Sequence, residues 1–146
     1  NSMEHIKEEI FIHQCIAQDG RMLNLSLPDI SEKKLDWDYI FKKARYDCIS
    51  PIVYQRLKSL PRNLVPTAVL NSFKNTYLMN ALRNEHLLRE LEKILKIIQK
   101  EGIPILLLKG IALINTVYKD AGLRPMVDMD VLLLKEHLPR FEKIIF

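Results

Sequence analysis

The sequence predicts an α+β protein that is mainly α, with a helical N-terminal domain over residues 1–102 and a small α/β unit over residues 103–146. Residues 67–101 contain no glycine or proline and place leucine and isoleucine at spacings of three and four, which is typical of a long helix. Two short apolar runs after Gly102 are typical of buried strands. The composition, 48% hydrophobic and 27% charged, is that of a folded chain.

Two helices are expected before residue 48. The first covers residues 4–19, where apolar residues form a helical stripe and Gly20 follows as a C-terminal stop. The second lies near residues 31–47, because Asp29 and Glu32 have the spacing of a capping box. Its inward face is predicted to consist of Trp37, Ile40, Phe41 and Ala44.

A short third helix and a long fourth helix complete the predicted helical domain. The third starts at Ser50, with Pro51 in its first turn. The fourth, over 67–101, would span roughly 50 Å if unbroken, so a bend or division between residues 77 and 84 is expected. Gly102 is its predicted end.

The predicted α/β unit begins with a strand in IPILLLKG and ends with a strand in DMDVLLL. A helix and a loop of nine residues connect the two strands, and a further helix follows them. In chain order, the expected elements are a strand from 104 to 109, a helix over 111–118, a loop over 119–127, a strand over 128–134 and a helix from 135.

Two carboxylates, Asp128 and Asp130, interrupt the second apolar run. Side chains alternate along a strand, so both acids are predicted to share one face as neighbours. Neighbouring carboxylates repel each other and lose hydration, which is tolerated when a cation lies between them or when both are in open solvent. The pair is therefore either a metal site or a solvated strand end.

A glycine at the end of the first strand favours the metal site. If the strands are antiparallel, Gly110 lies beside the aspartate pair, and its backbone N–H together with the following helix can approach an oxyanion. Lys109 and Arg124 would add cationic contacts to a triphosphate, although either can also be an ordinary surface cation. Asp128 and Asp130 would hold Mg²⁺ bridging phosphate oxygens. This combination predicts a nucleotide site.

At these residues the sequence resembles nucleotidyltransferases related to DNA polymerase beta, in which a glycine turn precedes an Asp-x-Asp strand. GIPILLLKGIALINTVYKDAGLRPMVDMDVLLL, residues 102–134, is more closely similar to an uncharacterised nucleotidyltransferase family. That family's pattern is a strand, Lys-Gly, a helix ending in Tyr, then Arg and Asp-x-Asp. The helical segments 35–57 and 83–104 also resemble the family, so the likeness covers most of residues 35–134.

The resemblance implies an incomplete nucleotidyltransferase α/β unit with two short antiparallel strands. Gly110 would be the phosphate-turn glycine, and Asp128 and Asp130 the catalytic, metal-binding pair. The implied reaction transfers NMP from an NTP to an acceptor hydroxyl with Mg²⁺, and the acceptor is a small molecule, a protein or RNA. Related enzymes carry Gly-Ser or Gly-Gly where this chain has Gly110-Ile111, and they use a third carboxylate from a later strand. The chain alone is therefore expected to be inactive and to be completed by more protein or by a homodimer.

Two other functions fit parts of the pattern. One is a non-catalytic helical interaction module with a vestigial nucleotidyltransferase site. The other is a haloacid-dehalogenase-like phosphatase, whose DxDxT motif follows a hydrophobic strand. Here the strand follows the acids and Leu132 occupies the threonine position, which disfavours the phosphatase.

Charge, cysteine content and hydropathy indicate which partners and which cellular compartment suit the protein. A formal net charge of +4 and a pI near 9.1 favour anionic partners, but the basic residues are scattered rather than clustered as in nucleic-acid-binding proteins. Cys15 and Cys48 suit a reducing cytoplasm and form no zinc-ligand spacing. No apolar run approaches the roughly 20 residues needed to span a bilayer, so no membrane association is expected.

Overall fold

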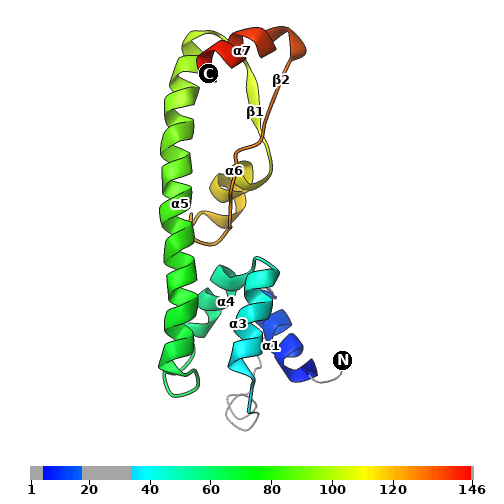
Figure 1. The fold of residues 1–146 in the computed structure, drawn as a ribbon, viewed down its shortest axis with the longest axis vertical. Helices are drawn as coiled ribbons and strands as arrows, with labels where there is room; N and C mark the ends of the chain where they lie inside the picture. Colours follow the sequence, from blue (N-terminus) through cyan, green and yellow to red (C-terminus); the bar gives the residue numbers. More distant parts are fainter. Residues whose placement is uncertain (1–4, 18–33, 146) are drawn as a thin grey trace. The chain divides into compact units, whose positions relative to one another are not determined.

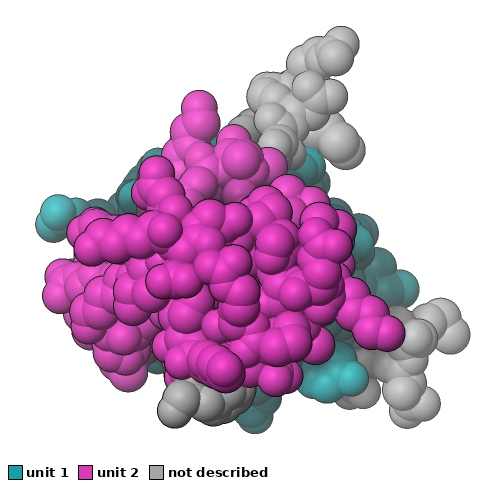
Figure 2. All heavy atoms as spheres, turned by 90° about the horizontal axis from the view of Figure 1, so that it is seen from above, with its two compact units in different colours: residues 1–78 teal, residues 79–146 magenta. Residues whose placement is uncertain are grey.

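A computed structural model describes residues 5–17 and 34–145. The chain divides into two compact units, Asn1–Leu78 and Met79–Phe146, which Figure 2 distinguishes by colour. Both are built mainly from helices, and the second also contains a small sheet, which confirms the predicted mainly α, α+β class. The domain boundary at residue 102 stays a prediction.

The first unit is a helical assembly around one apolar core. Its elements are α1 (Ile6–Ile16), α3 (Trp37–Tyr46), α4 (Ser50–Leu57) and the first part of α5 (Thr67–Lys100) (Figure 1). Their buried residues form a continuous cluster: Phe11, Ile12, Cys15, Ile40, Ala44, Val53, Leu57, Val65 and Phe73. Trp37 and Phe41 pack against this cluster, which confirms the predicted inward face of α3.

The start of α3 differs from the prediction. Residues 34–36 are not helical, and the helix begins at Trp37 because Asp36 caps it by accepting a hydrogen bond from Tyr39 N at 3.0 Å. The predicted capping residues, Asp29 and Glu32, lie outside the described residues. A carboxylate directly before the first helical residue provides the acceptor that the expected capping box would have supplied.

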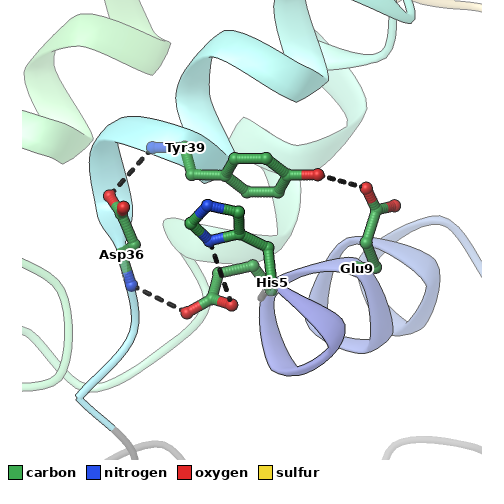
Figure 3. Close-up of polar contacts among 5 residues, drawn as sticks. His5, Glu9, Asp36 and Tyr39 are labelled. Atoms are coloured by element: carbon green, nitrogen blue, oxygen red, sulfur yellow. Dashed lines mark hydrogen bonds and ion pairs between the residues drawn. The ribbon is translucent and has the colours of Figure 1, made fainter. Parts of the chain in front are cut away.

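Polar contacts connect α1 to α3 (Figure 3). Glu8 is 2% exposed, and its Oε1 accepts a hydrogen bond from Asp36 N at 2.9 Å. The Tyr39 hydroxyl donates to Glu9 Oε1 at 2.5 Å, and the ring of His5 stacks on that of Tyr39 with centroids 3.9 Å apart. These contacts supplement the apolar packing of α1 against the core.

The remaining helices largely confirm the sequence predictions. α1 covers most of the expected first helix, and α4 starts at Ser50 with Pro51 in its first turn. α5 is one helix of 34 residues, so a division between residues 77 and 84 is ruled out, whereas the alternative of a bend there stays a prediction. Gly102, with φ +65°, follows its end and takes the left-handed conformation that glycine adopts at low cost. No helix in the described ranges is long and apolar enough to cross a membrane.

The second unit contains a two-stranded antiparallel sheet of β1 (Ile105–Leu107) and β2 (Val131–Leu133), which lie side by side in Figure 1. Leu106 pairs with Leu132 at the centre of the register, and the end of β1 lies opposite the start of β2. The predicted antiparallel arrangement is therefore confirmed. Both strands are shorter than expected, because the chain leaves the sheet before Lys109 and enters it only after Asp130.

Helices flank these strands. β1 leads directly into α6 (Lys109–Leu113) and the π-helix η1 (Ile114–Tyr118), whereas β2 is followed by the 3₁₀-helix η2 (Lys135–His137) and by α7 (Leu138–Ile145). A core cluster comprises Leu91, Ile111, Ile114 and Met126, with Leu87, Leu88, Leu95, Leu107 and Met129 packed against it. One face of the sheet contributes to this packing, while Leu106, Leu132 and Leu134 are more than half exposed.

Candidate active site

The antiparallel pairing brings the predicted phosphate turn and the aspartate pair to the same end of the sheet. Beyond the last strand pair, Leu108 N donates to Asp130 O at 2.9 Å, which extends the ladder by one hydrogen bond. This bond fixes Lys109, the next residue, beside Asp130. Their side chains form an ion pair, with Lys109 Nζ 3.2 Å from Asp130 Oδ2.

Lys109, the first residue of α6, rather than Gly110, has the left-handed backbone conformation where the chain passes from β1 into the helix. Its φ is +51°, a conformation that costs a residue with a side chain about 1–2 kcal/mol. Gly110 lies inside the first turn of α6 and has an ordinary helical backbone. Gly110 therefore needs no left-handed conformation, and its role as the phosphate-turn glycine stays a prediction. A strained lysine at a strand end is the kind of backbone outlier that occurs at functional sites.

Gly110 is needed for close packing. A Cβ added there would lie 2.8 Å from Met126 Sδ and 2.9 Å from Met126 Cγ, which is closer than real Cβ contacts. Met126 is buried in the core of the second unit, so it has little room to move. The same added atom would lie 3.9 Å from Arg124 Nε, which places the Arg124 side chain beside the start of α6. Lys109, Gly110 and Arg124 are thus brought together.

The two aspartates differ in their surroundings. Asp128 is exposed, whereas Asp130 is partly buried and pairs with Lys109. Within residues 5–17 and 34–145, no group of three or more histidine, cysteine or acidic side chains is placed to hold a metal ion. Mg²⁺ in nucleotide sites is usually held by one or two carboxylates together with phosphate oxygens and water. The donor set of Asp128 and Asp130 fits a metal ion that binds together with a triphosphate.

Comparison with protein families matches residues 33–146 to the family described as uncharacterised nucleotidyltransferase. The chain belongs to this family. The match includes α3 and every later element, whereas α1 precedes it. Searches of curated proteins and of solved structures found no match to the chain. This match confirms the predicted resemblance. The candidate site formed by Lys109, Gly110, Asp128 and Asp130 lies within the matched residues.

One buried polar residue beside the candidate site is not among the residues predicted from the sequence. Asn84, on α5, is fully buried, and its Nδ2 donates to the backbone oxygens of Ala121 and Arg124. The sequence does contain an indication that Asn84 is buried. Asn84 precedes Leu87, Leu88 and Leu91 by three, four and seven residues, so it lies on the apolar face of α5. A polar residue on a core-facing stripe requires a buried partner.

Proposed function

We propose that the protein transfers a nucleoside monophosphate from an NTP to an acceptor hydroxyl in a Mg²⁺-dependent reaction. The observation that carries the proposal is the pairing of β1 with β2, which brings Lys109 and Gly110 to the same place as Asp130, with Asp128 two residues before it. Membership of the nucleotidyltransferase family supports this assignment of the site.

Lys109 and Arg124 are assigned to the triphosphate. The ion pair of Lys109 with Asp130 is solvent-accessible, with side-chain exposures of 71% and 35%, so separating the two groups costs little. The lysine ammonium is therefore free to transfer from the carboxylate to phosphate oxygens when a nucleotide arrives. Arg124, beside Gly110, adds a planar guanidinium suited to phosphate oxygens.

Asp128 and Asp130 are assigned to metal binding. Mg²⁺, when bound, would supply charge neutralisation of the triphosphate and of the departing pyrophosphate. The acceptor oxygen forms a bond to the α-phosphorus, the bond from that phosphorus to the bridging oxygen breaks, and pyrophosphate leaves with the negative charge. The hydroxyl proton passes to solvent or to a carboxylate. The acceptor is a small molecule, a protein or RNA.

A second candidate function is a non-catalytic interaction module with a vestigial site. Two observations favour it: Lys109 already neutralises Asp130, and the outer face of the sheet exposes Leu106, Leu132 and Leu134. An interaction module needs an apolar surface but no free carboxylates. The two functions differ in whether the aspartates are required for any transfer of label from an NTP.

The test is incubation of the protein and a cell extract with each of the four α-³²P-labelled NTPs. Asp128→Asn is compared with Asp38→Asn, a control at an exposed aspartate of α3 in the first unit. Nucleotidyl transfer predicts that the wild type and Asp38→Asn label an acceptor and that Asp128→Asn does not. Equal labelling by all three proteins would reject the proposal and favour the interaction module.

A further inference from the structure

Asn84 joins α5 to the segment that carries Arg124. Its side chain is fully buried, and Nδ2 donates at 2.5 Å to Ala121 O and at 2.7 Å to Arg124 O. Both hydrogens of one carboxamide therefore bind carbonyls that lie three residues apart in the loop after η1. Because the Asn84 side chain is fully buried, its amide hydrogens need acceptors within the protein, since no water replaces them there.

Local hydrogen bonds shape the loop between these two carbonyls. Gly122 N donates to Asp120 Oδ1 at 2.8 Å, and Leu123 N donates to Asp120 O at 3.2 Å. They form a tight turn, but a turn on its own does not fix the direction in which the next residue leaves. The Asn84 amide binds one carbonyl inside the turn, that of Ala121, and one directly after it, that of Arg124, so it fixes the path of the backbone at Arg124.

The path of the backbone at Arg124 determines where the Arg124 side chain lies relative to Gly110. The carbonyl of Arg124 is bound by Asn84, while Nε of the same residue lies beside Gly110 and is buried without a hydrogen-bond partner among the described residues. Two residues later, Met126 fills the space that a Cβ at Gly110 would occupy. The backbone at Arg124 is thus anchored on α5, and its side chain extends towards the proposed phosphate site.

We infer that Asn84 is a positioning residue for nucleotide binding, which acts by holding Arg124 where its guanidinium reaches the triphosphate. The inference rests on the proposed function. It requires a neutral donor amide at residue 84: alanine supplies neither hydrogen, and an aspartate carboxylate would repel both carbonyl oxygens. Asn84 itself does not touch the nucleotide, so removing its amide should weaken nucleotide binding only while the Arg124 side chain is present.

A double-mutant cycle tests this dependence. The dissociation constants of the four α,β-non-hydrolysable NTP analogues with Mg²⁺ are measured for the wild type, Asn84→Ala, Arg124→Ala and the double variant. We expect Asn84→Ala to weaken binding about tenfold in the wild-type background and less than twofold in the Arg124→Ala background. If Asn84→Ala does not fold, Asn84→Ser, which keeps a single donor, replaces it in the same cycle.

Leu91→Ala is the matched control, because Leu91 is a buried residue of α5 in the same apolar cluster but makes no hydrogen bond to the loop. Its binding, measured where the variant is folded, should equal that of the wild type. Weakening by Asn84→Ala to the same extent with and without the Arg124 side chain would overturn the inference and leave the proposed function intact. If the wild type binds none of the four analogues, the proposed function fails, and the inference fails with it.

Discussion

Lys109 Nζ lies 3.2 Å from Asp130 Oδ2, so a cation from the end of β1 already contacts one of the two carboxylates assigned to the metal. The contact follows from the antiparallel register, which places Leu108 opposite Asp130. An exposed pair of this kind contributes about 0–1 kcal/mol, so it can be exchanged for other partners. On the proposed function, Lys109 would compete with Mg²⁺ for Asp130 in the absence of nucleotide and would bind phosphate in its presence.

Lys109→Met should change the affinities for metal and for nucleotide in opposite directions. Without the ammonium, Asp130 is free, so Mg²⁺ alone should bind several-fold more tightly, whereas the Mg²⁺–NTP analogue should bind several-fold more weakly. Titration calorimetry measures both. Lys100→Met, at the exposed end of α5, should change neither. A Lys109→Met protein with unaltered affinities would show that the ion pair has no role at the site.

Gly110→Ala should destabilise the protein because the new methyl group would overlap with Met126. Overpacking of this kind costs about 1–3 kcal/mol in the free energy of unfolding, measured by urea denaturation. In a Met126→Ala background the cost should largely disappear, because the atoms that cause the overlap have been removed. An equal loss of stability in both backgrounds would refute the packing explanation.

Gly102→Ala should also destabilise the protein, but through backbone strain and not through a steric overlap. Its added Cβ would meet nothing within 4 Å, but its φ of +65° is unfavourable for alanine. The expected loss is about 1–2 kcal/mol from backbone strain alone. This loss should be the same with methionine or alanine at residue 126, in contrast to that of Gly110→Ala. If the stability loss of Gly102→Ala also changed with the residue at 126, the different surroundings of the two glycines would not explain their effects.

The two cysteines should react very differently with thiol reagents. Burial raises the pKa of the Cys15 thiol to about 12, so almost no thiolate exists at pH 8, whereas Cys48 is exposed. Labelling with iodoacetamide should modify Cys48 in the native protein and Cys15 only after denaturation. A Cys48→Ser variant should take up no label while folded, and rapid labelling of that variant would contradict the burial of Cys15.

Tyr39→Phe should reveal a pH-dependent contribution to stability. The hydrogen bond from its hydroxyl to Glu9 raises the pKa of Tyr39 above the ordinary value of 10.0. A raised pKa means that the contribution is complete below pH 10 and is lost as the pH rises through the raised value. The variant should therefore melt below the wild type at pH 7, and the difference should shrink above pH 10.

Tyr46→Phe is the control for this titration, because Tyr46 is 85% exposed in the same helix. Its melting temperature should follow that of the wild type at every pH between 7 and 11. A difference between Tyr39→Phe and the wild type that stays constant across this range would show that the hydroxyl does not act through the Glu9 hydrogen bond.

Regular periodicity made much of this fold predictable from sequence. The apolar stripe of α5, the proline at the start of α4 and the two short apolar runs are local patterns, and each led to an element that the structure contains. The boundaries that depend on a single side chain were less predictable. Asp36 caps α3 ahead of Trp37, and a capping residue is not readily chosen among several candidate acids from local sequence alone.

The details of the site depend on contacts between residues distant in sequence. Two carboxylates that interrupt an apolar run identify the aspartate pair in the sequence, and the requirement of one common site predicts the antiparallel pairing. The sequence predicts a phosphate turn at Gly110, whereas the structure shows that its backbone is helical and that its lack of a side chain accommodates Met126. Asn84 contacts residues 37 and 40 positions later in the chain, and local periodicity carries no information about such pairs.

The central claim, transfer of a nucleotidyl group, is tested most directly by measuring both products of one NTP. The protein, with a cell extract as the source of acceptor, is given the NTP labelled either at the α-phosphate or at the γ-phosphate. The proposed function predicts that α-label enters an acceptor while an equal amount of labelled pyrophosphate appears from the γ-label, and that Asp128→Asn and Asp130→Asn abolish both. Transfer of γ-label to the acceptor, or pyrophosphate release that persists in both variants, would contradict it.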